Sequence, residues 1–173
     1  GNGLDDFTEH CLVVASHMLL IGEKAKDLKS GRQMAETALK DKTGLEQLKR
    51  LVKNQGGDVT YVENPVKFPL APIIREVESP QMGYLKAVDA LTVGETSVEM
   101  GAGRSKKDDT IDHRVGIIVH HKVGDFVNKG DPLFTLHANS ETSFEQARKR
   151  LITACNWQDE PVSPLPLFYE VIQ

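Results

Sequence analysis

The segment with the clearest chemical potential is a glycine-rich run at positions 101–109, GAGRSKKDD. Its candidate site residues are two glycines and three cations: Gly101, Gly103, Arg104, Lys106 and Lys107. The glycines permit a close approach of the backbone to a ligand, because they carry no Cβ atom. The cations could bind an anion through charge-assisted hydrogen bonds. The run has neither a Walker lysine-serine pair nor a Rossmann glycine spacing.

The same run has an alternative interpretation as a surface loop with local salt bridges. Three aspartates follow the cations and offset their charge: Asp108, Asp109 and Asp112. A glycine-rich loop without further motif residues does not decide between an anion site and such a loop. Both interpretations therefore stay open at the level of the sequence.

The histidines do not form a metal-ligand pattern. His120 and His121 are adjacent in a predicted strand, so their side chains point to opposite faces and cannot share an ion. His10 and His17 lie on similar faces of one predicted helix, but no HExxH-like pairing accompanies them. We interpret these histidines as structural or surface residues and predict no metal site.

Two further sets of reactive residues carry little weight. A Ser-His-Asp set could be assembled from Ser97, His113 and Asp112, but the sequence fixes no geometry between nucleophile and base. Cys11 and Cys155 are far apart and in no ligand spacing, which favours neither zinc nor a disulfide framework. We therefore expect a reducing, cytoplasmic setting.

The elements that must position the glycine-rich loop include two strands that follow it. Residues 115–121 and 132–137 are apolar and partly β-branched, which favours strands. Between them, Gly124-Asp125 and Gly130-Asp131 are turn dipeptides, because glycine adopts positive φ and aspartate can bond its own backbone. The sequence predicts a compact β unit that buries one face and reverses direction twice.

Helices are predicted before this β unit, up to about residue 55. Each of three helices begins with a capping signal, at Asp6–Glu9, Ser30–Gln33 and Thr43–Glu46. The first helix, 6–21, is apolar nearly all round, which is typical of a helix surrounded by protein. It is too short to span a membrane, which needs about 20 apolar residues. We infer that this helix requires more packing partners than one small domain provides.

A proline-punctuated stretch at 64–72 is predicted to be a linker. It divides the chain into a helical segment at 1–63 and a second domain at 73–173. Besides the two strands above, the second domain is predicted to contain strands at 73–78, 83–88 and 167–172 and helices at 90–100 and 143–154. This mixture predicts the α+β fold class.

Composition narrows the classes of partner. The 173 residues include 21 basic and 25 acidic side chains, a net charge of −4, which offers no electrostatic footprint for nucleic acid or an anionic membrane. Hydrophobic residues make up 39%, enough for a globular core. We expect neither nucleic acid nor a membrane among the partners.

Four ordered motifs give the chain a family resemblance that extends from about Leu4 to Ile172. They are His17-Met-Leu-Leu-Ile-Gly-Glu-Lys-Ala25, Asn54-Gln-Gly-Gly-Asp58, Gly101-Ala-Gly-Arg104 with Asp108, Ile111 and Asp112, and Val115-Gly-Ile117 followed by Lys122-Val-Gly-Asp125 and Lys129-Gly. With these motifs the chain resembles the C-terminal portion of the pyrimidine-nucleoside and thymidine phosphorylases.

The resemblance implies an activity for a longer protein and a place for this chain within it. The family is a group of pentosyltransferases of nucleoside salvage that cleave pyrimidine nucleosides with inorganic phosphate and give the base and (deoxy)ribose 1-phosphate. It implies late helices of a larger α/β domain followed by a small, hammerhead-like α+β domain, in a cytoplasmic homodimer. The family's Lys-His-Ser-Thr-Gly-Gly phosphate loop is absent from the sequence, so we assign no catalytic, cofactor or metal residue. Phosphate would be the co-substrate of the full-length enzyme, and the 101–109 run its candidate closure loop.

A second resemblance suggests a different class of function. The run Lys122-Val-Gly-Asp125 with Lys129-Gly-Asp131 is similar to half of a biotinyl or lipoyl carrier hammerhead. Such carriers place a modified lysine within Met-Lys-Met or Asp-Lys-Ala, and neither tripeptide occurs in the sequence. A stand-alone binding or carrier-like module is therefore the alternative to the phosphorylase portion.

Overall fold

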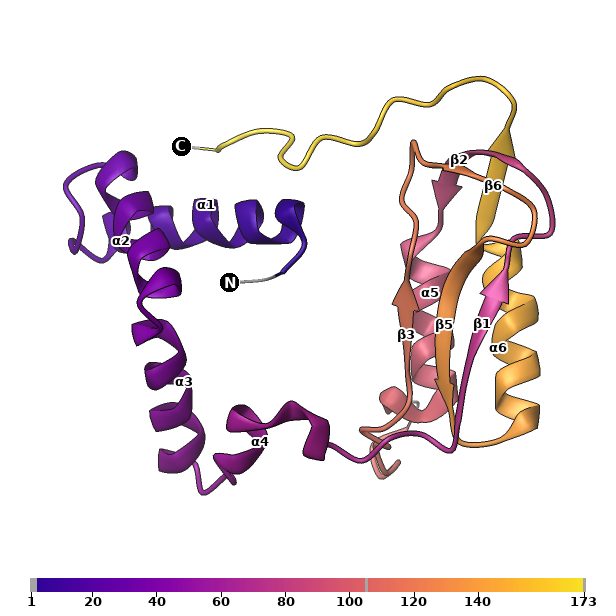
Figure 1. Ribbon diagram of the computed structural model, residues 1–173, viewed down its shortest axis with the longest axis horizontal. Helices are drawn as coiled ribbons and strands as arrows, with labels where there is room; N and C mark the ends of the chain where they lie inside the picture. Colours follow the sequence, from indigo (N-terminus) through magenta and orange to yellow (C-terminus); the bar gives the residue numbers. More distant parts are fainter. Residues whose placement is uncertain (1–2, 105, 173) are drawn as a thin grey trace. The chain divides into compact units, whose positions relative to one another are not determined.

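The computed structural model describes residues 3–104 and 106–172, which form two compact units (Figure 1). Unit 1 is the helical part of the chain up to Lys67 together with the segment from Leu167 onward. Unit 2 is Phe68–Pro166 and contains every strand of the described chain. The predicted α+β class is confirmed. No helix in the described residues is both long and apolar enough to cross a membrane.

Unit 1 contains α1 (Asp5–Ile21), α2 (Leu28–Lys40), α3 (Thr43–Asn54), the single turn α4 (Thr60–Glu63) and a short 3₁₀ helix, η1 (Pro65–Lys67). The last two fall in and beside the stretch expected to be a linker at 64–72. From Leu167 the backbone forms no strand up to Ile172, so the strand expected at 167–172 is wrong. One anchor of this segment is Phe168, whose ring stacks on His10 with 5.2 Å between the ring centroids.

The residues that cap the three helices differ from the predicted ones. The first helix has Leu4 at its N-cap and no side-chain capping bond. The second begins at Leu28, because Asp27 caps it and Ser30 is the reciprocal partner in the capping box. The third starts at Thr43 as expected, and Asp41 accepts the Thr43 amide at 2.9 Å. An aspartate two or three residues upstream therefore supplied the acceptor that we had assigned to Ser30 and Thr43.

Unit 2 is built on two three-stranded antiparallel sheets. The first has the order β1-β5-β3, formed by Ile73–Glu78, Pro132–Ala138 and Gly116–Val119. The second has the order β4-β2-β6, formed by Phe126–Val127, Gly83–Val88 and Cys155–Gln158. β1 and β2 match the predicted strands, whereas β6 was missed because CNWQ is short and carries two polar side chains.

Two helices contact the strands of the first sheet, α5 (Ala90–Ser97) and α6 (Glu141–Thr153) (Figure 1). The helix α5 continues into a wider π-helical turn, η2 (Val98–Ala102). Ser140 caps α6 by accepting the Ser143 amide at 3.2 Å, so this helix begins earlier than the Ser143 start that we predicted.

The core of unit 2 lies between the sheets and the two helices. Its buried members come from both sheets, from η2, from α6 and from the residue before β3: Val77, Leu85, Met100, Val115, Val127, Leu133, Phe134, Leu136, Ala138, Phe144, Ala147, Leu151 and Cys155. Burying each large aliphatic side chain stabilises the fold by about 1.5–3 kcal/mol before conformational entropy is subtracted. This core holds the two ends of the glycine-rich loop, since Met100 precedes the loop and Val115 follows it.

Candidate functional site

The glycines of the predicted loop are required by the backbone at its start. Gly101 has a φ of 107°, a left-handed conformation that L side chains rarely adopt. Gly103 is extended, but a Cβ atom there would lie 2.8 Å from Cγ2 of Val98. Gly101 has a second role, because its carbonyl oxygen accepts a hydrogen bond from the Asp112 amide at 2.9 Å. The two glycines therefore serve local structure, whether or not a ligand approaches them.

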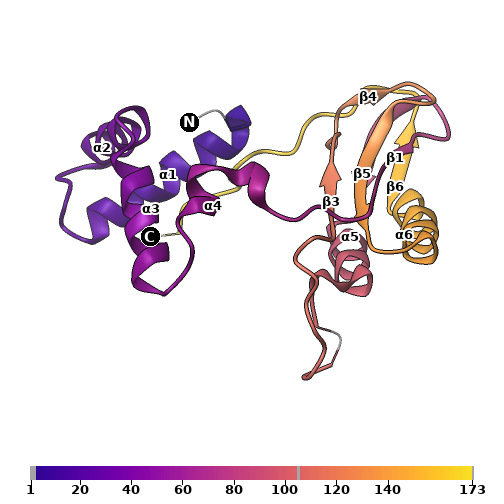
Figure 2. The same ribbon diagram turned by 60° about the horizontal axis from the view of Figure 1, so that its bottom comes forward.

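The loop itself projects from unit 2 between η2 and β3 (Figure 2). A turn organises its middle, because the Lys106 amide donates to Oδ2 of Asp109 at 2.8 Å and the Asp109 amide donates to the Lys106 carbonyl at 3.1 Å. Arg104, Lys106 and Lys107 are exposed. Within residues 3–104 and 106–172 their charged groups have no hydrogen-bond or ion-pair partner. The structure thus presents three cations on one protruding loop.

The base of the loop is fixed by an ion pair that sequence reasoning had not singled out. The guanidinium of Arg114 donates from Nε to Oδ1 of Asp112 at 2.9 Å and from Nη2 to Oδ2 at 2.8 Å. These hydrogen bonds lower the pKa of the Asp112 carboxyl to about 2. Asp112 therefore neutralises Arg114, a residue outside the predicted site, and both of its oxygens are used, which disfavours the set with Ser97 and His113.

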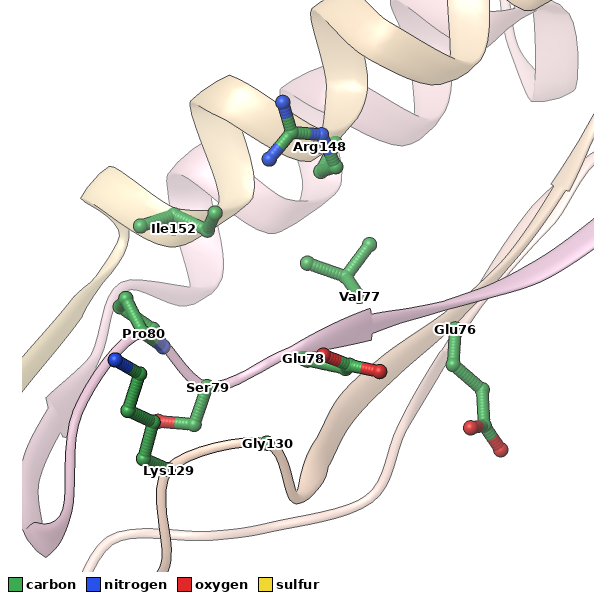
Figure 3. Close-up of a pocket in the computed structure, with 9 residues that line it drawn as sticks. All are labelled: Glu76, Val77, Glu78, Ser79, Pro80, Lys129, Gly130, Arg148 and Ile152. Carbon is green, nitrogen blue, oxygen red and sulfur yellow. The ribbon is translucent and has the colours of Figure 1, made fainter.

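A second candidate feature is a surface groove of about 370 Å³ in unit 2 (Figure 3). Its lining residues come from β1 and the turn after it, from the β4–β5 turn and from α6: Glu76, Val77, Glu78, Ser79, Pro80, Lys129, Gly130, Arg148 and Ile152. In Figure 3 Arg148 and Ile152 extend from α6 above Val77, while the Lys129 chain lies along Ser79 and Pro80. Sequence reasoning missed this groove, because its residues are scattered over 77 positions, from 76 to 152, without a motif.

The groove carries charges of both signs, and the guanidinium of Arg148 is already bound to a carboxylate. Arg148 donates from Nε and Nη2 to Oε2 of Glu145, at 3.0 and 2.9 Å. The Ser79 hydroxyl donates to the Gln81 carbonyl at 2.7 Å. Glu76 and Glu78 add two carboxylates to the same lining. This arrangement offers no concentrated field for an anion, and we assign it no ligand.

The loop and the groove lie at opposite ends of the first sheet. β1 and β3 both run antiparallel to β5, so they run parallel to each other. The groove lies at the carboxyl end of β1, whereas the loop enters the amino end of β3. Arg104, Lys106 and Lys107 therefore lie together on one protrusion, with Gly101 and Gly103 at its start, and the groove is elsewhere.

His120 and His121 make local contacts. His120 Nε2 lies 2.7 Å from the Thr135 hydroxyl, and His121 Nδ1 lies 3.6 Å from Oδ2 of Asp125. In the described part of the chain no three His, Cys, Asp or Glu side chains gather as a metal site would require. The thiol of Cys155 is buried, which raises its pKa to about 11.

Comparison with known proteins first identifies the family of the domain in unit 2. Residues 84–157, which carry most of unit 2, match the family described as Pyrimidine nucleoside phosphorylase C-terminal domain. The chain is also 39% identical over 172 residues to the pyrimidine-nucleoside phosphorylase of Geobacillus stearothermophilus, and 34% identical to that of Staphylococcus aureus strain USA300. Over its length the chain is similar to a portion of these enzymes, and that portion includes the region that matches the C-terminal domain family. The matches cover 99% of this chain but only 40% and 39% of these relatives.

Proposed function

We propose that this chain is the C-terminal portion of an enzyme that cleaves pyrimidine nucleosides with inorganic phosphate, giving the free base and ribose or deoxyribose 1-phosphate. The observation that carries the proposal is the match over 99% of the chain to relatives named for this activity. Thymidine and uridine are both candidate substrates. The full enzyme would act as a cytoplasmic homodimer with phosphate as co-substrate and no cofactor held by this chain.

Within that enzyme the role of the chain is structural support. The described residues place their buried core around two sheets and two helices, and the charged side chains of the loop and groove lie at the surface. An enzyme of this reaction must hold phosphate beside the anomeric carbon and stabilise an oxocarbenium-like transition state. We assign those tasks to the remainder of the polypeptide. Unit 2 would then form the half of the cleft that closes on it, and the domain limits at 1–63, 64–72 and 73–173 belong to this proposal.

Activity assays on two polypeptides test the proposal. The purified 173-residue chain and the longer polypeptide encoded by the same gene are each incubated with uridine or thymidine, with and without phosphate. We expect phosphate-dependent release of the base by the longer polypeptide and none by the chain alone. Turnover by the 173-residue chain would overturn the structural role, and a longer polypeptide inactive on both nucleosides would overturn the assigned reaction.

The cations of the 101–109 loop have a proposed role in closure of the same enzyme. The proposal is supported by their exposure and by the absence of partners for Arg104 within residues 3–104 and 106–172. We expect Arg104→Ala in the longer polypeptide to raise KM or lower kcat at least several-fold. Arg50→Ala, which removes an exposed arginine from α3, is the control and is expected to leave both constants unchanged. Unchanged constants for Arg104→Ala would end the closure proposal.

A further inference from the structure

Helix α1 has two apolar faces, and only one of them is packed against α2. Leu12 and Ser16 are buried, with 7% and 4% of their surface exposed. Gly31 of α2 approaches this face so closely that a Cβ atom there would lie 2.9 Å from the Ser16 carbonyl oxygen. Arg32 of α2 adds an ion pair to Glu9 at 2.7 Å. This side of α1 is fully used by unit 1 itself.

The opposite side of α1 is an uninterrupted apolar stripe in contact with solvent. We call it the outer seam, and its members are Phe7, Cys11, Val14, Met18 and Ile21. Their spacing of four, three, four and three residues places them along one line of an α-helix, because each residue turns the helix by about 100°. Phe7, Met18 and Ile21 are 64%, 67% and 81% exposed. Phe168, which stacks on the neighbouring His10, leaves the seam in this exposed state.

The charge pattern disfavours a parallel pairing of two copies along this seam. Between Asp5 and Ile21 the helix carries Asp5, Asp6 and Glu9 at its amino end and no lysine or arginine. A second copy aligned in parallel would bring these carboxylates together, and like charges on adjacent helices repel. Because the residues of the seam are apolar, a partner for the seam should present an apolar surface to them.

The relatives indicate where such a partner would come from. The chain spans only 40% of the Geobacillus stearothermophilus enzyme, so most of that enzyme lies outside the matched region. We propose that the outer seam of α1 is covered by an apolar surface of the polypeptide that the longer protein carries outside the matched region. This inference rests on the proposed function, because it requires the longer protein. It assigns α1 as an element packed on both faces, between α2 and that polypeptide.

Cys11 lies in the seam and gives a direct measurement of its coverage. The chain has two cysteines, and the other, Cys155, is only 5% exposed. Thiol modification with Ellman's reagent under native conditions should therefore be fast at Cys11 and slow at Cys155. We expect the Cys11 rate to be at least tenfold lower in the longer polypeptide than in the 173-residue chain, while the Cys155 rate stays slow in both. A Cys11→Ser variant assigns the fast phase.

A pair of variants separates coverage from a general change in stability. Met18→Glu places a charge in the outer seam, and Gln47→Glu places the same charge on an exposed position of α3. In the longer polypeptide, Met18→Glu should restore Cys11 reactivity at least threefold, and Gln47→Glu should leave it unchanged. Met18 is exposed in unit 1, so the 173-residue chain should keep its helix content with either substitution.

Four outcomes overturn the inference. Equal Cys11 rates in the two polypeptides would show that the seam stays open, and equal effects of Met18→Glu and Gln47→Glu would show that the protection is not local. Protection of Cys11 in the 173-residue chain that grows with its concentration would assign the seam to a second copy instead. A longer polypeptide that cleaves uridine with phosphate but leaves Cys11 reactive would reject the seam proposal and retain the proposed function.

Discussion

Three glycines of unit 2 allow the cost of backbone strain to be separated from the cost of a close contact. Gly124 and Gly130 occupy equivalent positions in the KVGD and NKGD turns, with φ values of 100° and 91°. A Cβ atom at Gly124 would lie 3.1 Å from the backbone of Pro164 and from the Val162 carbonyl oxygen, whereas one at Gly130 would meet nothing within 4 Å. Gly116 has neither a positive φ nor a neighbour within 4 Å.

These differences set the expected change in the free energy of unfolding for alanine at each position. Alanine at Gly130 is forced into a left-handed conformation and should lower the free energy of unfolding by about 1–2 kcal/mol. Alanine at Gly124 has the same strain plus overpacking against a backbone, which costs about 1–3 kcal/mol more. Alanine at Gly116 should be neutral or raise the free energy of unfolding by about 0.5–1 kcal/mol, because glycine weakens a strand.

Urea unfolding of the 173-residue chain measures the series. The single tryptophan, Trp157, lies in β6 and packs against the core of unit 2, so its fluorescence reports the unit that contains all three glycines. For a unit of this size, 1 kcal/mol should shift the thermal midpoint by about 4–8 °C, which gives a second readout. If Gly124→Ala and Gly130→Ala agree within about 0.5 kcal/mol, the contact with the 162–164 segment contributes nothing and the reasoning is refuted.

Two further predictions concern ion pairs of unit 2. Arg150 of α6 donates to Glu95 of α5 and to Glu99 of η2, so Arg150→Met should lower the melting temperature of this unit more than Arg148→Met, whose partner Glu145 lies on the same helix. The difference should shrink in 1 M salt, where surface charges are screened, and a salt-independent difference would contradict the electrostatic cause. Asp112, whose pKa is lowered to about 2 by its bonds from Arg114, should stabilise unit 2 above pH 4 and lose that contribution as the pH falls toward 2. Melting curves of the native chain and Asp112→Asn should therefore converge between pH 4 and 2, and a constant difference down to pH 2 would argue against this linkage.

The sequence predicted much of the order of elements in unit 2 because its strands have strong local signals. β1 and β2 are bounded by proline, glycine or aspartate, and both strands formed over the predicted residues. The caps were harder to place, since Asp27 and Ser30 can each serve as the acceptor and only the backbone conformation of Asp27 decides between them. β6 escaped prediction because its pairing with β2 provides the stabilisation that CNWQ lacks by itself.

For the candidate site the sequence indicated the residues of the loop but not their surroundings. Glycine at positions 101 and 103 indicated an unusual backbone, and the cations that follow indicated a charged loop. The sequence does not decide which charges pair. In the structure Asp112 binds the Arg114 guanidinium, and its amide donates to the Gly101 carbonyl oxygen. The groove beside Lys129 and Arg148 likewise depends on α6 lying near β1, a contact between residues far apart in the chain.

By itself the sequence determined the α+β class, the turns at Gly124 and Gly130, and the resemblance to the phosphorylases. These depend on local backbone preference and on residue order, which a chain carries before it folds. Tertiary structure alone decided that Leu12 and Ser16 turn toward α2 while Phe7 and Met18 turn away from it. The physical reason is that α1 is apolar nearly all round, so its composition requires burial on every side, and only the close approach of Gly31 selects which side unit 1 can bury.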